Sequence, residues 1–188
     1  MLSASKKIIG KKVIHLEEID STNEEARRLI EKGEDEGVVV VADYQSEGRG
    51  KPGNRWYSEK GVGVYLSAIV RPFKNPKDLS SITLLGARAG IAAIMKVSGL
   101  QGKIKPPNDI MINDKKVGGV LVGRVSSGHL IIGIGINVNH KKESFPEEIK
   151  NRATSLKMEC GKNISIGKFI EVLISELNRE YLEYLRKV

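Results

Sequence analysis

The chain has 188 residues, which is enough for one well-formed core and too few for two ordinary domains. With 40% hydrophobic and 29% charged residues, it has the composition of a globular protein rather than of a disordered chain. We find no apolar run close to the ~20 residues of a membrane helix, and no apolar segment typical of a signal peptide at the start. Cys160 is the only cysteine, which excludes an intramolecular disulfide. We therefore expect a cytoplasmic protein without a membrane span.

The net charge of +8 raises the question of nucleic-acid binding. The cations are spread from Lys6 to Lys187 without a dense basic stripe, and aromatic residues make up only 5% of the chain. That leaves little surface on which bases could stack. A diffuse positive field is better explained by attraction to an anionic nucleotide or an acidic partner protein. We expect no nucleic-acid partner; salt-dependent binding to duplex DNA would test that alternative.

Hydrophobic periodicity predicts the elements in chain order. We expect a strand at Val13–Leu16, a helix over residues 23–31, a strand at Val38–Ala42, a polar loop at Tyr44–Lys60, a strand at Val62–Val70, a helix over residues 77–97, strands at Asp109–Ile112, Lys116–Val122 and Leu130–Val138, and a C-terminal helix with the stripe Phe169, Leu173, Leu177, Tyr181 and Leu185. Ser21 and Glu24 suggest a capping box, Gly99 a helix end, and Asn113–Asp114 a hairpin turn. The pattern predicts one α/β (α+β) domain with a mixed, largely antiparallel sheet flanked by helices.

The loop between the second and third expected strands contains a glycine-rich motif. Gly48 to Gly53 fits the dinucleotide pattern G-x-G-x-x-G, but a Rossmann turn must open directly into a helix. Here Arg55 and Trp56 lead into another strand. A P-loop is excluded as well, because Pro52 stands where Ser or Thr is needed. We reject both interpretations.

The same loop nevertheless suits a phosphorylated ligand. Its glycines allow close approach of the backbone, and Arg49 and Lys51 bring two positive charges. Trp56 offers an aromatic face on which a purine could stack. The alternative is a solvated surface loop, although a tryptophan is an uncommon residue to leave in one.

Four segments in order resemble the motifs of biotin protein ligases. Residues 43–56 (DYQSEGRGKPGNRW) resemble the adenylate-binding loop GRGRxGRxW of that family. Residues 20–23 (DSTN) resemble the family motif STN. Residues 105–110 (KPPNDI) with residues 115–122 (KKVGGVLV) resemble KWPNDI…KxGGILVE. Residues 133–139 (GIGINVN) match the motif GIGINVN. Each segment is short, but their shared order makes the resemblance specific. It implies the class II synthetase-like biotin/lipoate ligase fold, with residues 1–188 as the catalytic domain.

The resemblance also implies a reaction in two steps. The carboxylate of biotin attacks the α-phosphate of ATP, giving biotinyl-5′-adenylate and pyrophosphate. A lysine of a biotin carboxyl carrier protein then attacks the mixed anhydride and releases AMP. ATP, accompanied by Mg²⁺, and biotin are therefore the expected small molecules. The sequence does not fix the oligomeric state: relatives include monomers and dimers, and a homodimer is one expectation.

Site residues carry over by position in the matching motifs. Lys116 and Arg49 are the expected catalytic residues. The expected biotin contacts are Ser21, Thr22, Asn23, Gln45, Arg49, Gly50, Lys51, Lys116 and Gly119. The expected ATP and adenylate contacts are Gly48, Arg49, Lys51, Trp56, Asn108, Asp109, Lys116 and Asn137. No protein metal ligand is assigned, and His15, His129 and His140 match no motif and receive no role.

The sequence departs from the family at several points. Lys51 and Asn54 stand where arginine or another basic residue is usual, and Pro106 replaces the tryptophan of KWPND. Lysine keeps the charge of arginine and loses its planar, bidentate fork. We also expect no N-terminal helix-turn-helix domain and no C-terminal β-barrel domain. The alternatives left open are a lipoate or octanoate ligase of the same superfamily, and a non-catalytic relative that only binds biotin.

Overall fold

The computed structural model describes residues 6–74, 76–125 and 128–187. The first five residues, where we predicted no signal peptide, lie outside that part. Within the described residues the strands form a seven-stranded sheet in the order β1-β2-β3-β7-β6-β5-β4. Their bounds are β1 Lys12–Ile19, β2 Val38–Gln45, β3 Gly63–Val70, β4 Lys103–Lys105, β5 Asp109–Ile112, β6 Lys115–Arg124 and β7 Leu130–Asn137. Only the β1–β2 pairing in this sheet is parallel, which confirms the predicted mixed, largely antiparallel sheet.

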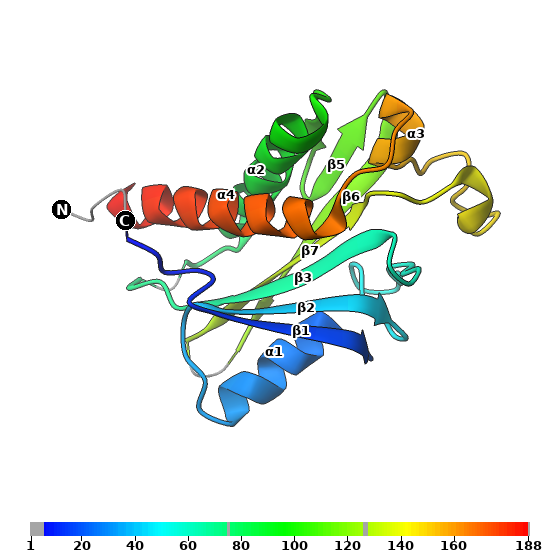
Figure 1. The fold of residues 1–188 in the computed structure, drawn as a ribbon. Helices are drawn as coiled ribbons and strands as arrows, with labels where there is room; N and C mark the ends of the chain where they lie inside the picture. The colour runs from blue at the N-terminus through cyan, green and yellow to red at the C-terminus, as the bar shows by residue number, and fades with distance from the viewer. Residues whose placement is uncertain (1–5, 75, 126–127, 188) are drawn as a thin grey trace.

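Helices cover the sheet on both faces (Figure 1). The short α1 lies on one face, whereas α2 and α4 cross each other on the opposite face. Their bounds are α1 Thr22–Glu31, α2 Ser80–Ser98, α3 Leu156–Cys160 and α4 Ile166–Lys187, with a single 3-10 turn at Lys142–Ser144. The chain thus forms three layers, with the sheet between α1 and the α2–α4 pair.

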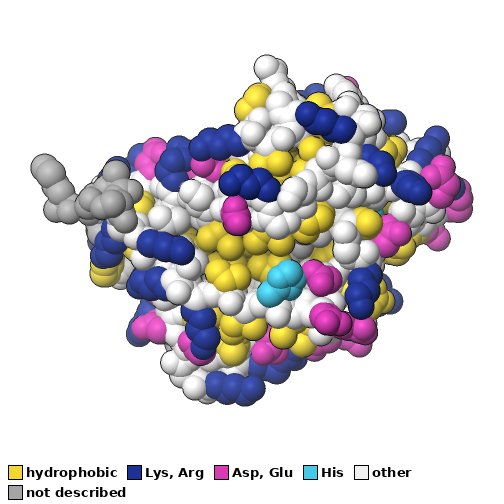
Figure 2. Space-filling model, in the orientation of Figure 1, with side chains coloured by type: hydrophobic (Ala, Val, Ile, Leu, Met, Phe, Trp, Pro, Cys, Tyr) yellow, Lys and Arg dark blue, Asp and Glu magenta, His cyan; other side chains and the backbone are white. Residues whose placement is uncertain are grey.

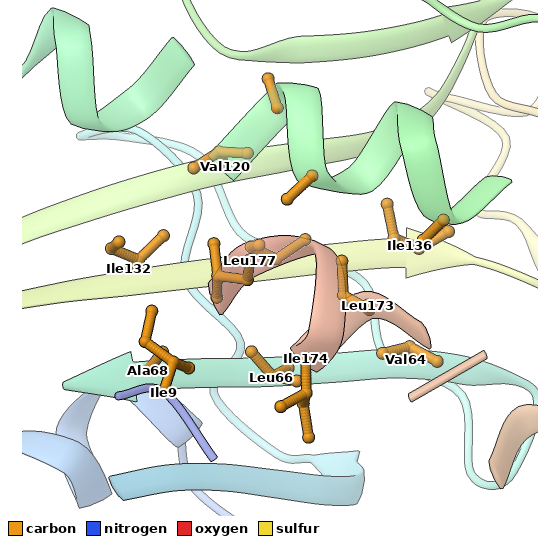
Figure 3. Close-up of a cluster of buried hydrophobic side chains, with 14 of the residues drawn as sticks. Ile9, Val64, Leu66, Ala68, Val120, Ile132, Ile136, Leu173, Ile174 and Leu177 are labelled. Carbon is orange, nitrogen blue, oxygen red and sulfur yellow. The ribbon is translucent and has the colours of Figure 1, made fainter. Parts of the chain in front are cut away.

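The main hydrophobic core lies between the sheet and the helices α2 and α4. Figure 3 shows its centre, where Leu173 and Leu177 of α4 face Leu66, Ile132 and other strand residues. All of these side chains are almost completely buried. A smaller cluster under α1 joins Ala26 and Ile30 of that helix to residues on the other face of the strands, namely Val40, Ile69 and Ile131. Alternate residues of each strand therefore pack against different helices, α1 on one face and α2 with α4 on the other.

Most expected elements are confirmed, with longer ends than predicted for the first two strands. The turn at Asn113–Asp114 has φ of 46° and 61°, as a type I′ hairpin requires, and Gly99 ends α2 with φ of 75°. Besides the 3-10 turn, two short elements were missed. β4 has only three residues, two of them exposed lysines, and α3 has five, so neither carries a periodic apolar pattern.

The predicted capping box at the start of α1 is wrong. Ser21 occupies the N-cap position, but its side chain makes no capping hydrogen bond. Its intended partner Glu24 instead accepts a hydrogen bond from the guanidinium of Arg49 at 2.8 Å. The Ser21 side chain is therefore not committed to the helix end.

The expectation that no segment could span a membrane also needs correction. α2 is long and apolar enough to do so by length and composition alone. Its residues Ile82, Leu85 and Ile94 are fully buried against the sheet and α4. A core helix has the same composition as a membrane helix, so this property is weak evidence for a membrane span.

The face of the molecule in Figure 2 shows how surface charge is distributed. Lys and Arg side chains are scattered around its periphery and alternate with Asp and Glu. Hydrophobic side chains gather in the middle of this face, between α4 and the edge strand β1. The scattered cations match the even spread of lysine and arginine along the sequence.

Candidate active site

A cavity of about 510 Å³ opens on the face of the sheet that carries α1. Ile69 of β3 and Ile131 of β7 face α1. Every second residue of a strand lies on the same face, and on this face Tyr65 of β3 and Gly133 and Gly135 of β7 line the cavity. Ser21, Thr22 and Asn23, at the N-terminus of α1, close one end of it. All the predicted contact residues except Gly48 line this cavity. Their individual roles remain predictions.

Glycines form the floor of the cavity. A Cβ at Gly135 would lie 2.5 Å from Cε2 of Trp56, and a Cβ at Gly133 would lie 2.3 Å from Oδ1 of Asn23. At Gly119 a Cβ would meet both the Trp56 ring and the Lys116 side chain at 3.4 Å. The Trp56 ring thus rests against the glycines of the sheet. Side chains on this floor would fill the cavity.

A buried polar network lines the end near α1. The backbone N–H and the hydroxyl of Thr22 both donate to Oε1 of Gln45, at 2.9 and 3.0 Å. The Gln45 amide donates to Ser58 Oγ at 3.2 Å. Beneath them, the hydroxyl of Ser67 lies within hydrogen-bond distance of Thr22 Oγ1 and Asn23 Oδ1. The network holds neutral donors and acceptors at fixed positions, as recognition of a polar ring requires.

The turn before α1 is fixed by an ion pair. Both carboxylate oxygens of Asp20 accept hydrogen bonds from Arg28, at 2.7 and 2.9 Å, and one also accepts the N–H of Ser21 at 2.6 Å. The hydrogen bond from Arg28 lowers the pKa of Asp20 to about 2. Asp20 therefore stays ionised and holds Ser21 at the cavity edge.

Lys116 reaches the cavity because β6 contains a bulge. The pairs Ile110–Gly118 and Met111–Lys116 leave Val117 without a partner in β5. Without this extra residue, Lys116 and Gly119, three positions apart, would face opposite sides of the sheet. With it, Val117 turns into the core and Lys116 joins Gly119 on the cavity side.

The ammonium group of Lys116 has two close neighbours. It forms an ion pair of 2.7 Å with Asp109 and lies 5.6 Å from the centre of the Trp56 ring. The Lys116 backbone is held as well: its N–H donates to the Arg152 carbonyl and its carbonyl accepts from the Thr154 N–H, at 2.8 and 2.9 Å. Lys116 is therefore fixed at both its backbone and its side chain.

The glycine-rich loop folds back on itself before β3. Arg49 and Arg55 form an antiparallel bridge, and the Trp56 N–H donates to the Gly48 carbonyl at 2.8 Å. The loop leads into a strand, which confirms that it is neither a Rossmann turn nor a P-loop. Gly48 does not line the cavity; a Cβ there would lie 2.5 Å from the Trp56 carbonyl oxygen, so this glycine lets the ends of the loop meet. Arg49 lies at the cavity edge, half exposed and paired with Glu24.

Two asparagines differ in how they are held. The Asn137 amide donates to the Thr154 carbonyl at 3.0 Å, which ties the 152–154 segment to β7. Asn108 donates to the Val120 carbonyl at 2.9 Å, but its Oδ1 is buried and has no hydrogen-bond partner. A buried acceptor left unpaired is costly, so this oxygen is available for a ligand group.

Sequence reasoning missed one wall of the cavity. Phe145, Ile149 and Arg152 line it from the chain between β7 and α4, where no element was predicted. A connection of this length without expected structure is itself a signal, because long loops in compact domains are usually functional.

A histidine also follows β7 in this connection: His140 is fully buried. Among the described residues, no group of three or more His, Cys, Asp or Glu side chains is placed to hold a metal ion.

The fold and the site together define a class: an α/β domain whose glycine-floored cavity is lined by neutral polar groups and by cations. Residues 16–138 match the model of the biotin/lipoate A/B protein ligase family, and the chain belongs to that family. This confirms the family expected from the four motifs and the predicted fold.

Individual relatives are similar over nearly the whole chain. The chain is 38% identical to the bifunctional ligase/repressor BirA of Bacillus subtilis and 31% identical to that of Escherichia coli, covering 95% and 89% of this chain. It spans about half the length of these curated relatives, 56% and 53%. The biotin protein ligase of Aquifex aeolicus, solved in complex with biotin and ATP, superposes with a TM-score of 0.83 at 35% identity, covering 94% of this chain and 73% of that one.

Proposed function

We propose that this chain is the catalytic unit of a biotin protein ligase, which activates biotin with ATP and transfers it to a lysine of a biotin carboxyl carrier protein. One observation carries the proposal. Cations from three separate segments, Arg49, Lys116 and Arg152, line the same cavity as the neutral hydrogen-bonding groups of Thr22 and Gln45. A ligand with a neutral polar ring and a carboxylate, bound next to a polyphosphate, matches that combination.

The polar end near α1 would hold the ureido ring of biotin. That ring has both N–H donors and a carbonyl acceptor, and Thr22, Asn23 and Gln45 supply the complementary groups. The uncommitted Ser21 hydroxyl lies at the same end. The valeryl chain would then run over the glycine floor beside Trp56, which leads its carboxylate to Lys116.

The cationic end would hold ATP. Arg49 and Lys51 from the loop and Arg152 from the opposite wall bring positive charge to the phosphates. The exposed face of Trp56 would stack on the adenine. Mg²⁺ prefers oxygen ligands, and the unpaired Oδ1 of Asn108 and the carboxylate of Asp109 fit that preference. When bound with ATP, the ion would neutralise phosphate charge.

The chemistry requires charge neutralisation rather than a protein nucleophile. An oxygen of the biotin carboxylate attacks the α-phosphorus, and the bond to the bridging oxygen breaks to release pyrophosphate. Lys116 would exchange Asp109 for the two anionic groups that approach each other. In the second step the neutral amine of the carrier lysine attacks the biotinyl carbonyl carbon, loses a proton and releases AMP.

The first test is mass spectrometry of the nucleotide products after incubation with Mg²⁺-ATP and biotin. We expect biotinyl-adenylate from the unmodified protein and at least about 100-fold less from Lys116→Ala, since the lost group stabilises transition-state charge. Lys115→Ala is the matched control, because Lys115 is exposed and does not line the cavity. Parallel reactions contain lipoate or octanoate in place of biotin.

Each alternative has its own outcome in that experiment. An adenylate formed with lipoate or octanoate and not with biotin would assign the chain to the sister activity of the family. No adenylate with any of the three acids would indicate a non-catalytic relative. Equal activity in Lys116→Ala and Lys115→Ala would remove Lys116 from the reaction. The carrier protein, the homodimer and the cytoplasmic location remain predictions.

A further inference from the structure

A buried histidine lies beside the cavity, outside the groups used above. His140 is fully inaccessible to solvent and lies just beyond the end of β7. Its ring stacks on Phe145, with centroids 5.3 Å apart and an angle of 12° between the planes. Its Nε2 lies 3.4 Å from the hydroxyl of Tyr65. Phe145 and Tyr65 both line the cavity, so His140 supports two walls from behind.

His140 also closes the base of a loop. Residues 141–153 leave β7 at His140, line the cavity with Phe145, Ile149 and Arg152, and return to the sheet beside Lys116. At the end of this segment, the hydroxyl of Ser155 donates to the His140 carbonyl at 2.6 Å. The backbone of His140 thus links the two ends of the 141–153 segment, and its ring contacts the segment itself through Phe145.

The polar contacts of the imidazole set its protonation state. Tyr65 donates its single proton to the Glu59 carbonyl at 3.0 Å, so the ring must be the donor to the tyrosine oxygen. Its other nitrogen, Nδ1, is buried without a partner, as is Oε2 of the neighbouring Glu59. Burial lowers the pKa of His140 to about 4, so the ring is neutral near pH 7. A neutral ring can stack flat on Phe145 without an unpaired buried charge.

We propose that His140 is a positioning residue for the nucleotide end of the cavity: by stacking on Phe145 and closing the base of the 141–153 segment, it places Arg152 for ATP. This inference rests on the proposed function, since it assigns Arg152 to the nucleotide. The polar end near α1 is built from Thr22, Gln45 and Ser67, none of which contacts the ring. Loss of the ring should therefore weaken ATP binding more than biotin binding, because the ring is connected to Gln45 only through Tyr65 and Ser58.

The test compares three variants by calorimetric titration with ATP and with biotin separately. His140→Ala removes the stack and should raise the Kd for ATP about tenfold, with the Kd for biotin changed less than about twofold. His140→Phe keeps a stacking ring and should restore most of the ATP affinity. Ile132→Ala is the control for general destabilisation, because Ile132 is equally buried on the other face of the sheet. Equal losses of ATP and biotin binding in His140→Ala would overturn the proposal, as would a loss of ATP binding no larger than in Ile132→Ala.

A second measurement does not depend on any ligand. Hydrogen exchange of the amides in residues 142–152 should be faster in His140→Ala than in the unmodified protein, while exchange in β3 and β7 stays unchanged. Unchanged exchange in that segment would overturn the positioning role even if the protein proved not to bind ATP. Conversely, faster exchange without ATP binding by the unmodified protein would contradict the proposed function and leave the role of His140 in ordering the segment intact.

Discussion

Strand β7 presents Ile132, Ile134 and Ile136 to α2 and α4, whereas Gly133 and Gly135 alternate with them on the opposite face. The isoleucines fill the main core (Figure 3), and the glycines leave room for the cavity and for Trp56. The same eight residues thus contribute to both the main core and the cavity. Stability and ligand binding are therefore separated by side of the sheet, not by position along the chain.

The largest effect on stability should come from the apolar side. Ile132→Ala removes buried methyl and methylene groups from the core and should lower the free energy of unfolding by about 2–5 kcal/mol. Urea denaturation followed by circular dichroism measures this loss. The protein that remains folded should bind biotin as before. A folded variant with much weaker biotin binding would show that the two faces are not separate.

A substitution on the glycine side should lower activity rather than stability. In Gly135→Ala the new Cβ would lie 2.5 Å from the Trp56 ring and displace it, so adenylate formation should fall about 100-fold, equivalent to about 3 kcal/mol. Trp56 is the only tryptophan, so a shift in fluorescence reports its displacement directly. The control is Gly167→Ala in α4, where a Cβ would meet no atom within 4 Å. Full activity with an unchanged emission spectrum would contradict the assignment of Gly135 to the seat of Trp56.

The two faces also differed in how far the sequence could predict them. Alternation in the 133–139 motif predicts a strand at once, and the apolar runs place the sheet and its helices. The position of Lys116 was harder to foresee, because the bulge at Val117 depends on pairing with β5. A strict alternation would have turned Lys116 away from Gly119, and only the resemblance to the family motif assigned them to one site.

The wall formed by Phe145, Ile149 and Arg152 was missed for a related reason. These residues lie in a segment without periodicity, and its position is set by contacts distant in sequence, such as those of Arg152 with the backbone of Lys116. The burial of His140 could not be predicted either, since neighbouring residues 141–143 are exposed and charged. Local patterns specify elements, whereas sites assembled from several loops depend on the tertiary fold.

Acid should lower the free energy of unfolding through His140, which lies beside the cavity. Its pKa is lowered from 6.5 to about 4 by burial, so below pH 6.5 the unfolded chain binds a proton that the folded one does not. Stability from this group is complete above pH 6.5 and is lost as the pH falls toward 4, by about 2 kcal/mol at pH 5. Glu59 and Tyr65 face the ring, and the charge of Glu59 opposes the shift.

Unfolding in urea at several pH values between 4 and 7 measures this slope. His140→Phe, which cannot titrate, should show a flatter dependence over the same range. The lowered pKa of Asp20 stabilises the fold at pH values above 3.8, and this stabilisation is lost mainly below that value, outside the range in which His140 is tested. An identical pH dependence in the unmodified protein and in His140→Phe would show that this ring does not couple stability to pH.

The smallest expected effect concerns the loop that covers the cavity, which belongs to neither face of β7. Lys51 is exposed at the cavity edge and brings one positive charge without the planar fork of arginine. Lys51→Arg should therefore retain biotinyl-adenylate longer, lowering its dissociation rate by about threefold, or less than 1 kcal/mol. Lys60→Arg is the matched control, because Lys60 is exposed and does not line the cavity. A dissociation rate in Lys51→Arg no slower than in the unmodified protein would mean that a planar fork at this position does not help to retain the adenylate.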